Sequence, residues 1–444
     1  MTKPYKHLYL PIEESARELN ARLLLVIAAM QKGYRVVIGQ QWLMINNLQN
    51  LAPGVVFFKG TNKVQSNWMK FAKKHGHKIV AIDEEVTAIA DRRFVLKEVW
   101  PDSLPLIDRF FMQGQNQLDI YTDEFPEHRD RFMITGNPRF DLLRKEFTKA
   151  FNDDAEAYRA QYGRYILINT NFGYVNTAWG KPENFVQVCE NVGYVNREDP
   201  EDRKFLNDFY DLEVMNMAGF KVMTRKLRDR FPDHQVIIRP HPAEDVEAWK
   251  NALSGEERIH VVFEGSAVPW MLGADYFIHN TCTTGTEAMV LGVPVGAYAF
   301  YTNWVESIFL SNLVTPVYRD MDELFDAVAT GIRDRTGAVE TIRSDRDAVL
   351  RQHISGLDKV LATAGVFRGI NELDVECASG SIYRDGKGLK IEMERTEYQR
   401  KKINLDLTEL NQRLINLVKV AGISFSAKAE KMGDSLFLIT PVDD

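Results

Sequence analysis

Residues 274–298, ADYFIHNTCTTGTEAMVLGVPVGAY, contain one complete unit of the predicted fold. The apolar run ADYFI is typical of a buried strand, and VPVGAY, from residue 293, is typical of the next one. Between them the chain passes through four threonines and a glycine, and a helical segment then follows with Glu287 in its first turn. A strand, a helix and another strand in this order predict two parallel strands joined by a crossover helix.

The same alternation runs through most of the chain. Strand-like runs begin near residues 7, 34, 54, 77, 108 and 131, and again near residues 164, 234, 260, 275, 293 and 315. Segments with helical spacing separate them. We therefore expect two Rossmann-like domains with parallel sheets of about six strands each, an N-terminal domain at residues 1–150 and a second at residues 151–365. A long insertion at residues 171–233 separates the first two strands of the second domain.

The remaining residues, 366–444, have a different pattern. Residues 381–393 and 424–439 resemble two hairpins, and residues 404–422 form an amphipathic helical pattern between them. We expect a small α+β appendage that serves self-association, as a homo-oligomer, or contact with a partner. A lid that only covers a sheet edge explains the pattern equally well.

Bulk properties narrow the class of protein. With 444 residues the chain is long enough for two domains, and its net charge of −7 argues against a general nucleic-acid binder. No signal peptide and no run of roughly 18 apolar residues is present. The three cysteines lack metal-ligand spacing, which fits a reducing compartment. We expect a cytoplasmic protein, and peripheral association with the inner face of the membrane stays open.

Ligands of open α/β sheets bind at the carboxyl ends of the strands, so polar residues that directly follow strands are candidates. In the first domain, Asp83, Glu84 and Glu85 follow one strand. Neighbouring carboxylates raise one another's pKa, as a general base or nucleophile requires, although an acidic helix start explains them too. Arg139, in the segment GNPRFD at residues 136–141, could reach a phosphate or carboxylate, but a structural turn is the better local interpretation.

In the second domain, two polar clusters follow strands. Asn169 and Asn171 flank a threonine, and their amides could hold sugar or phosphate oxygens or could simply close a turn. In the segment RPHP, Arg239 precedes His241, and the prolines on either side, including Pro242, fix the backbone so that the imidazole points one way. A rigid histidine beside an arginine suits an anion such as a leaving phosphate. A histidine satisfied within the core is the alternative.

The helix start in the opening stretch forms the third cluster. Its backbone N–H groups and hydroxyls predict a phosphate site, and Glu287 could accept hydrogen bonds from a ribose. The candidates are Thr281, Thr283, Thr284, Gly285 and Glu287. A capping box between Thr284 and Glu287 is the alternative, and the two interpretations are compatible.

Signals of other enzyme classes are missing. The sequence has no GxxxxGK[ST] loop and no GxGxxG after its first strand, which disfavours a nucleoside triphosphatase and a dinucleotide oxidoreductase. Two acidic pairs, Asp320 with Asp322 and Asp345 with Asp347, have a spacing that could hold a metal, but helix capping is the better interpretation. We therefore expect no metal site and no cofactor.

A chain of two Rossmann-like halves, with phosphate-binding features concentrated in the C-terminal one, resembles a glycosyltransferase of the GT-B architecture. More narrowly, six motifs together resemble the bacterial surface carbohydrate biosynthesis proteins, a group similar to capsule and lipopolysaccharide Kdo transferases and to polysialyltransferases. The motifs are LYLPIEESARELNARLLL, VAIDEEV, TGNPRFDLLR, ILINTNFGYVN, RPHP and NTCTTGTEAMVLGVPV, between residues 7 and 365 or so.

The resemblance implies roles for individual residues. An acidic pair supplies a catalytic carboxylate, which here corresponds to Asp83 and Glu84. A His-Pro pair contacts the nucleotide phosphate, which corresponds to His241 with its following proline, and His241 also counts among the catalytic candidates. A Ser/Thr pair after one of the last strands also contacts the nucleotide phosphate, and it corresponds to the threonines at 283 and 284. Glu85 stands where the relatives have glycine, so which carboxylate faces the substrate stays open.

The resemblance also implies a reaction. The donor would be a CMP-activated 2-keto sugar acid, such as Kdo or a nonulosonate, and the acceptor an oligosaccharide or lipid-linked glycan. Asp208 and Asp211, in the insertion, are further candidates for substrate binding. Three alternatives remain: a teichoic-acid-type CDP-polyol phosphotransferase, an NDP-hexose transferase or epimerase, and a non-catalytic scaffold of a polysaccharide assembly complex.

Overall fold

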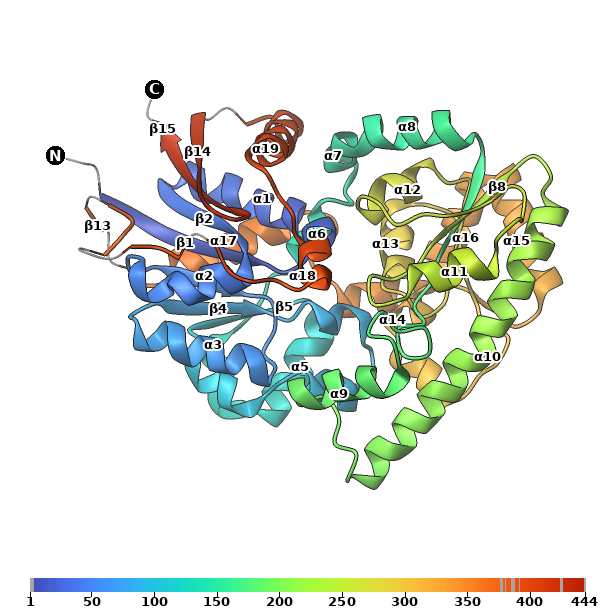
Figure 1. Cartoon of the computed structure of the whole chain (residues 1–444), viewed down its shortest axis with the longest axis horizontal. Helices are drawn as coiled ribbons and strands as arrows, with labels where there is room; N and C mark the ends of the chain where they lie inside the picture. Colours follow the sequence, from blue (N-terminus) through green and yellow to red (C-terminus); the bar gives the residue numbers. More distant parts are fainter. Residues whose placement is uncertain are drawn as a thin grey trace. The chain divides into compact units, whose positions relative to one another are not determined.

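The computed structural model describes residues 4–375, 378–379, 381–384, 388–390, 392–423 and 426–442 (Figure 1). The chain divides into two compact units. Unit 1 comprises Met1–Glu84, Glu98–Ala150 and His353–Asp444, and unit 2 comprises Glu85–Lys97 and Phe151–Gln352. Among the described residues, no helix combines the length and the apolar character that crossing a membrane requires.

Unit 1 is built on a sheet whose six central strands are parallel, in the order β2-β1-β3-β4-β5-β6. The strands are β1 (Pro4–Ile12), β2 (Tyr34–Gln40), β3 (Val55–Phe58), β4 (Lys78–Ile82), β5 (Arg109–Met112) and β6 (Phe132–Ile134). Most of their residues are buried, as expected when crossover helices cover both faces of a parallel sheet. The six strands predicted for the first half are confirmed.

The helices of unit 1 connect these strands and complete its C-terminal part. They are α1 (Ser15–Gln31), α2 (Gln41–Asn47), α3 (Lys63–Lys74), α5 (Gln115–Glu124), α6 (Pro138–Asp141), α7 (Lys145–Thr148), α17 (Ala362–Asn371), α18 (Glu397–Lys402) and α19 (Leu407–Ala421).

The C-terminal residues do not form the separate appendage that the sequence predicts from residue 366. They belong to unit 1, where β15 (Leu436–Val442) pairs antiparallel with β2 and β14 (Ser426–Gly433) pairs with β15 (Figure 1). Phe437 and Ile439 are fully buried by this pairing. The physical reason is that the open edge of β2 offers unpaired backbone groups, which the tail satisfies. The edge-covering alternative therefore describes the tail better.

Two of the three elements predicted in the tail are present. The amphipathic helix is α19, which buries Leu410, Leu414 and Leu417, and the second hairpin is formed by β14 and β15. The hairpin predicted at 381–393 includes residues 385–387 and 391, which lie outside the described residues. A short strand, β13 (Ala378–Ser379), pairs antiparallel with the start of β1.

Unit 2 has a six-stranded, fully parallel sheet in the order β12-β11-β10-β7-β8-β9. The strands are β7 (Tyr165–Asn169), β8 (Gln235–Arg239), β9 (Ile259–Val261), β10 (Tyr276–His279), β11 (Val295–Tyr298) and β12 (Val317–Tyr318). All six predicted strands are confirmed. The stretch at 274–298 forms β10, α13 (Thr284–Leu291) and β11, and these two strands pair in parallel as predicted.

The other helices of unit 2 pack around this sheet. They are α4 (Arg92–Lys97), α8 (Asn152–Tyr162), α9 (Pro182–Val192), α10 (Pro200–Arg230), α11 (Val246–Ala252), α12 (Ala267–Gly273), α14 (Leu310–Val314), α15 (Met321–Arg333) and α16 (Arg335–His353). The predicted insertion contributes α9 and the 31-residue α10. The C-terminal half of α10 buries Phe220, Met223 and Leu227 in the core of the unit.

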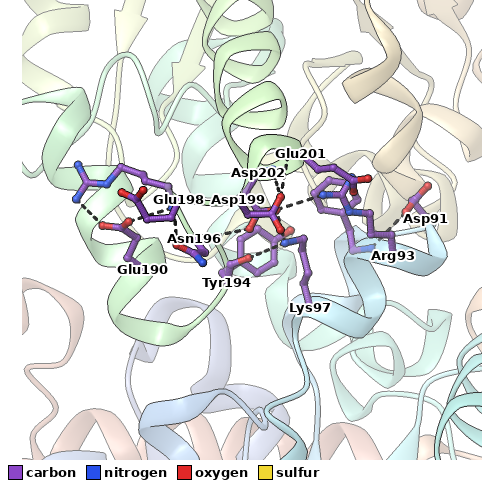
Figure 2. Close-up of polar contacts among 12 residues, drawn as sticks. Asp91, Arg93, Lys97, Glu190, Tyr194, Asn196, Glu198, Asp199, Glu201 and Asp202 are labelled. Carbon is purple, nitrogen blue, oxygen red and sulfur yellow. Dashed lines mark hydrogen bonds and ion pairs between the residues drawn. The ribbon is translucent and has the colours of Figure 1, made fainter.

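The connection from β4 to β5 makes an excursion into unit 2. After Glu84 the chain forms a short 3-10 helix (Glu85–Ala88) and α4, whose side chains contact the insertion (Figure 2). Lys97 Nζ lies 2.5 Å and an Arg93 terminal nitrogen 3.2 Å from Asp202 Oδ1, and Asp202 also accepts a backbone hydrogen bond. Phe94 is buried, with its ring 4.7 Å from that of Phe205.

We expect Asp202→Ala to lower the free energy of unfolding by about 1–3 kcal/mol, because it leaves the partly buried Lys97 ammonium without its carboxylate. Chemical denaturation measures this, and proteolysis should cut the chain faster within residues 85–97. Asp211→Ala, on the exposed side of the same helix, is the matched control and should change stability by about 0.5 kcal/mol or less. Equal effects of the two substitutions would contradict this interpretation of the excursion.

Two buried histidines make the stability of unit 1 depend on pH. Burial lowers the pKa of His7 and of His77 to about 4, and His77 Nε2 donates to the carbonyl of Leu48. The folded state thus keeps both rings neutral, whereas the unfolded chain binds protons below its ordinary pKa of 6.5. Their contribution to stability is therefore complete above pH 6.5 and falls as the pH drops toward 4.

We expect each histidine to remove about 1 kcal/mol between pH 6.5 and 5.5. Denaturation curves at the two pH values test this with His77→Gln, which keeps a donor for Leu48 but does not titrate. The pH dependence of that variant should be weaker by about 1 kcal/mol. An unchanged pH dependence would show that the pKa of His77 is the same in the folded and unfolded states.

Candidate functional site

The candidate residues of unit 2 meet at the carboxyl edge of its sheet. Asn169, at the end of β7, is in register with His279 at the end of β10 on one side and with Arg239 at the end of β8 on the other. The three segments that follow these neighbouring strands therefore start at the same level of the sheet. This is the edge at which ligands of open α/β sheets bind.

A hydrogen bond joins the end of β7 to the start of α13. Asn169 Nδ2 donates to Thr284 Oγ1 at 3.2 Å, and the Thr284 hydroxyl donates to Cys282 Sγ at 3.0 Å. Asn169 Oδ1 is buried and has no hydrogen-bond partner among the described residues. The side chain of Asn280 makes two hydrogen bonds to the backbone of Asn171. It accepts from the N–H of Asn171 at 2.8 Å and donates to the carbonyl of Asn171 at 3.1 Å. Asn169 thus lies at the site, and the backbone at Asn171 forms a turn.

The RPHP segment holds His241 in one orientation. Its backbone N–H donates to Glu244 Oε1 at 2.9 Å, and its Nδ1 accepts from the N–H of Ala243 at 3.1 Å. Because Nδ1 is an acceptor, the proton of the neutral ring is on Nε2. His241 and Pro242 are half-buried, so the imidazole is not a core histidine. The arrangement therefore fixes the orientation of the imidazole at the carboxyl edge of the sheet.

The observed contacts of Arg239 are structural. A terminal nitrogen donates to the carbonyls of Glu264 and Gly265, each at 2.9 Å, and the guanidinium lies 5.6 Å from the ring centre of Trp270. Burial lowers the pKa of Arg239 to about 10. Arg239 therefore anchors the loop that follows β9, and its nucleotide-binding role stays a prediction.

Glu244 is central to the site, although the sequence pattern does not single it out. Its carboxylate is buried and accepts hydrogen bonds from the Thr170 hydroxyl (2.7 Å), the His241 N–H (2.9 Å), Trp249 Nε1 (2.7 Å) and Asn176 Nδ2 (3.4 Å). Burial raises the pKa of Glu244, and these hydrogen bonds oppose the rise. Glu244 ties the segment after β7 to the segment after β8. Its only signal in the sequence is its place three residues after His241.

The start of α13 differs from a capping box. Thr283 precedes the helix with helical backbone angles, and no side chain caps the helix. The carbonyl of Thr283 accepts from the N–H groups of Thr286 at 3.0 Å and Glu287 at 3.3 Å, so the Thr284–Glu287 box is not formed. Glu287, expected to receive a ribose, is buried, with 5% of its surface exposed. No side chain caps α13, so the positive end of its dipole still favours an anion, although the N–H groups of residues 285–287 already donate to the carbonyls of Cys282 and Thr283.

Gly285 and Thr281 have backbone requirements of their own. A Cβ on Gly285 would lie 2.4 Å from His279 Nε2, so the glycine allows α13 to pack on β10. Thr281 has a φ of 46°, a left-handed conformation that is unfavourable for a β-branched residue. Such strain costs of order 1–3 kcal/mol and is concentrated at binding and catalytic sites. Thr281 therefore fits a site residue, whereas Gly285 has a packing role.

Of the three acidic candidates after β4, Asp83 and Glu84 belong to unit 1 and are buried and hydrogen-bonded. Asp83 Oδ2 accepts from the Thr61 hydroxyl at 3.1 Å. Glu84 accepts from Asn137 Nδ2 at 3.0 Å, and its other oxygen lies 3.5 Å from a terminal nitrogen of the buried Arg22. Glu85 is exposed and begins the 3-10 helix, as the helix-start alternative predicted. The pair at 83 and 84 is therefore held rigidly at the end of β4.

The GNPRFD segment is a structural turn. Asn137 caps α6 by accepting from the N–H of Arg139 at 3.0 Å, and Asp141 accepts from the N–H groups of Ala362 (2.8 Å) and Thr363 (2.7 Å) at the start of α17. Burial raises the pKa of Asp141 to about 6. Arg139 is half-buried, and its substrate-binding role stays a prediction.

The two aspartates of the insertion lie on α10. Asp208 forms an ion pair with Lys204 and accepts from Trp304 Nε1 at 2.5 Å, and these hydrogen bonds lower the pKa of Asp208. Asp211 is exposed. In the part of the chain that the structure describes, no contact joins either residue to the cluster at the strand ends. Asp208 instead holds the segment around Trp304 to α10.

The two acidic pairs interpreted as helix caps have different environments. Asp320 caps α15, accepting from the N–H groups of Asp322 at 2.7 Å and Glu323 at 3.2 Å, as predicted. Asp345 and Asp347 lie inside α16, not at its start, so their assignment as caps was wrong. Within the described ranges, no group of three or more His, Cys, Asp or Glu side chains could hold a metal ion.

Comparisons with known proteins establish the fold. No family model and no curated protein matches the sequence. A structure of the wall teichoic acid polymerase TagF aligns with a TM-score of 0.50 at 12% identity, over 84% of this chain and 89% of that one. A putative UDP-N-acetylglucosamine 2-epimerase from Listeria monocytogenes aligns with a TM-score of 0.50 at 12% identity, over 83% of this chain and 96% of that one. With its two parallel-sheet α/β units, the chain therefore has the GT-B type of fold predicted from its sequence.

Proposed function

We propose that this chain is a glycosyltransferase of surface polysaccharide synthesis, which takes its sugar from a nucleotide-activated donor and binds the donor's phosphate in unit 2. The observation that carries the proposal is the meeting of His241, Asn169 and the uncapped start of α13 at one edge of the sheet. The names of two proteins with this fold add support, since one is a teichoic acid polymerase and the other a putative nucleotide-sugar epimerase.

The chemistry of this edge suits a departing phosphate. As the bond between sugar and phosphate breaks, negative charge develops on the phosphate oxygens. The Nε2–H of His241 and the positive end of the α13 dipole would stabilise that charge, and the hydroxyls of Thr281 and Thr283 would add to them. Because these groups are positioned before the reaction, they stabilise the transition state without a reorganisation cost.

We further propose that the donor is a CMP-activated 2-keto sugar acid and the acceptor an oligosaccharide or lipid-linked glycan at the cytoplasmic face of the membrane. The basis is the resemblance of six sequence motifs to surface carbohydrate biosynthesis proteins. Transfer would need no obligatory metal, because a nucleotide monophosphate leaves from protein donors alone. Dialysis against EDTA should leave the rate unchanged, and restoration of a lost rate by Mg²⁺ would contradict this part of the proposal.

A teichoic-acid-type CDP-polyol phosphotransferase is the second candidate. It is favoured by the fold similarity to the wall teichoic acid polymerase TagF. The same phosphate-binding edge would then hold a pyrophosphate instead of a single phosphate.

Nucleotide-dependent stabilisation tests the proposal and separates the two candidates. The melting temperature is measured with CMP, CDP, UDP and GDP. A nucleotide that binds only the folded chain, at a hundredfold excess over its Kd, stabilises by about 2.7 kcal/mol. We expect the largest shift with CMP, and hydrolysis of a CMP-sugar acid but not of CDP-glycerol. CDP-glycerol hydrolysis would select the second candidate, a preference for UDP would favour a hexose transferase or epimerase, and no shift at all would overturn the proposal.

A further inference from the structure

Three side chains form a row across the middle of the unit 2 sheet, at its carboxyl edge. Asn169 is in register with Arg239 on one neighbouring strand and with His279 on the other. Residues in register on neighbouring strands point to the same face of a sheet. The hydrogen bond from Asn169 to Thr284 and the close packing of Gly285 on His279 identify this face as the one that α13 covers. Arg239 therefore lies on the face of the sheet that bears the amino end of α13.

The guanidinium of Arg239 carries a positive charge that no ion pair with a carboxylate balances among the described residues. One terminal nitrogen donates to two neutral carbonyls, those of Glu264 and Gly265. The Nε–H is buried and has no hydrogen-bond partner in the described part of the chain. On one side lies the ring of Trp270, which is stacked on Tyr158. Because a charge taken out of water is costly unless it is paired, Arg239 retains a capacity to bind an anion.

The pKa of Arg239 agrees with this incomplete compensation. Burial lowers the pKa of Arg239 to about 10, and the influences of Tyr158, Cys282 and the exposed Glu264 oppose this shift without cancelling it. The influence of Cys282, which lies just before α13, also fits a position of the guanidinium near the amino end of that helix. With a pKa of about 10 the side chain is charged at neutral pH.

Arg258, in the same unit, provides a contrast. It directly precedes β9 and so lies at the amino edge of the sheet, away from the strand ends that bind ligands. Its terminal nitrogens donate to four backbone carbonyls, those of Arg228, Phe231, Pro232 and His234. Arg258 therefore has a structural role, and it is a matched control for Arg239.

We propose that Arg239 binds a second anionic group of the donor, beside the phosphate that His241 and the amino end of α13 receive; this rests on the proposed function. The second group is either the carboxylate of an activated sugar acid or the second phosphate of a nucleoside diphosphate. Both present oxygens that share a negative charge, to which a guanidinium donates well. Arg239 thereby selects donors that carry two anionic groups over ligands that carry one.

Dissociation constants for CMP, CDP and a CMP-sugar acid test this role in wild-type, Arg239→Gln and Arg258→Gln chains. Arg239→Gln should raise the Kd of CDP or of the CMP-sugar acid about 10–100-fold, as expected for a lost hydrogen bond between charged groups. The Kd of CMP should stay nearly unchanged, which also shows that unit 2 is folded. A loss with CDP identifies the second group as a phosphate, and a loss with the CMP-sugar acid identifies it as a carboxylate. Arg258→Gln should leave the ratios between the three Kd values unchanged.

A second variant and two inorganic probes complete the test. Arg239→Lys keeps the charge and should lose less affinity for the doubly anionic ligand than Arg239→Gln. If no nucleotide binds to the wild-type chain, the proposed function fails, and Arg239 is then judged by pyrophosphate against phosphate. Pyrophosphate should raise the melting temperature more than phosphate, and Arg239→Gln should remove the difference. Equal losses for CMP and CDP, unchanged ratios in Arg239→Gln, or no preference for pyrophosphate when nucleotides fail to bind would each overturn the inference and leave Arg239 a structural anchor.

Discussion

Replacement of His241 by alanine is expected to lower the rate of sugar transfer by about 10²–10³-fold while unit 2 stays folded. The loss has this size because removing one preorganised donor to a developing oxyanion costs about 2.7–4 kcal/mol. The fold should persist because the bond between the His241 backbone N–H and Glu244 does not involve the ring. His241→Gln should lose less, since its amide places a donor close to the position of Nε2.

Steady-state rates with a CMP-activated donor measure this effect. His260→Ala is the matched control, because His260 lies in the same unit and its ring bonds Gln235 at 2.8 Å within the sheet. The control should keep its rate within about threefold, as expected for a group that does not touch the reacting atoms. A His241→Ala chain as active as this control would remove His241 from the mechanism.

Glu244→Ala is expected to have the largest effect on stability, about 4 kcal/mol, together with loss of the nucleotide-induced melting shift. The substitution leaves four donors without their acceptor, from Thr170, Asn176, His241 and Trp249, and each buried unsatisfied group costs about 1–3 kcal/mol. The sum is reduced because some of these groups will reach water. Nucleotide binding should fail because the RPHP segment loses its attachment to the end of β7.

Chemical denaturation and melting with CMP measure the two effects. Glu247→Ala, three residues away and exposed, is the control and should change stability by about 0.5 kcal/mol or less. The loss of stability in Glu244→Gln should lie between those of Glu244→Ala and Glu247→Ala. The amide keeps one acceptor oxygen, but its NH₂ group faces donors where the carboxylate had an acceptor. A stable Glu244→Ala chain that still binds CMP would show that the carboxylate does not organise the site.

The strands could be predicted from the sequence because each one is encoded locally. A run such as YILIN at 165–169 is apolar throughout, as a strand covered on both faces must be. The partner of a strand is not encoded locally, which explains the error in the tail. The pattern of 436–442 predicts a strand, but nothing in it indicates that it pairs with β2, some 400 residues earlier. Likewise, the acidic residues after β4 do not reveal that the chain next joins unit 2.

The site could be predicted in part for the same reason. The position of a residue at a strand end follows from the strand pattern, so the sequence places His241 and the threonines of α13 correctly at one edge of the sheet. Side-chain contacts depend on distant residues, and Glu244 escapes prediction because its four donors span residues 170 to 249. The alternative interpretation, a capping box between Thr284 and Glu287, is not realised, because α13 begins at Thr284 and the N–H of Glu287 donates to the carbonyl of Thr283.

A structure of the full chain with bound CMP tests the central claim most directly. The account predicts that a phosphate oxygen lies within hydrogen-bond distance of His241 Nε2 and that the phosphate lies at the amino end of α13. A nucleotide bound at another place, or an edge of the unit 2 sheet that stays vacant at saturating CMP, would contradict it.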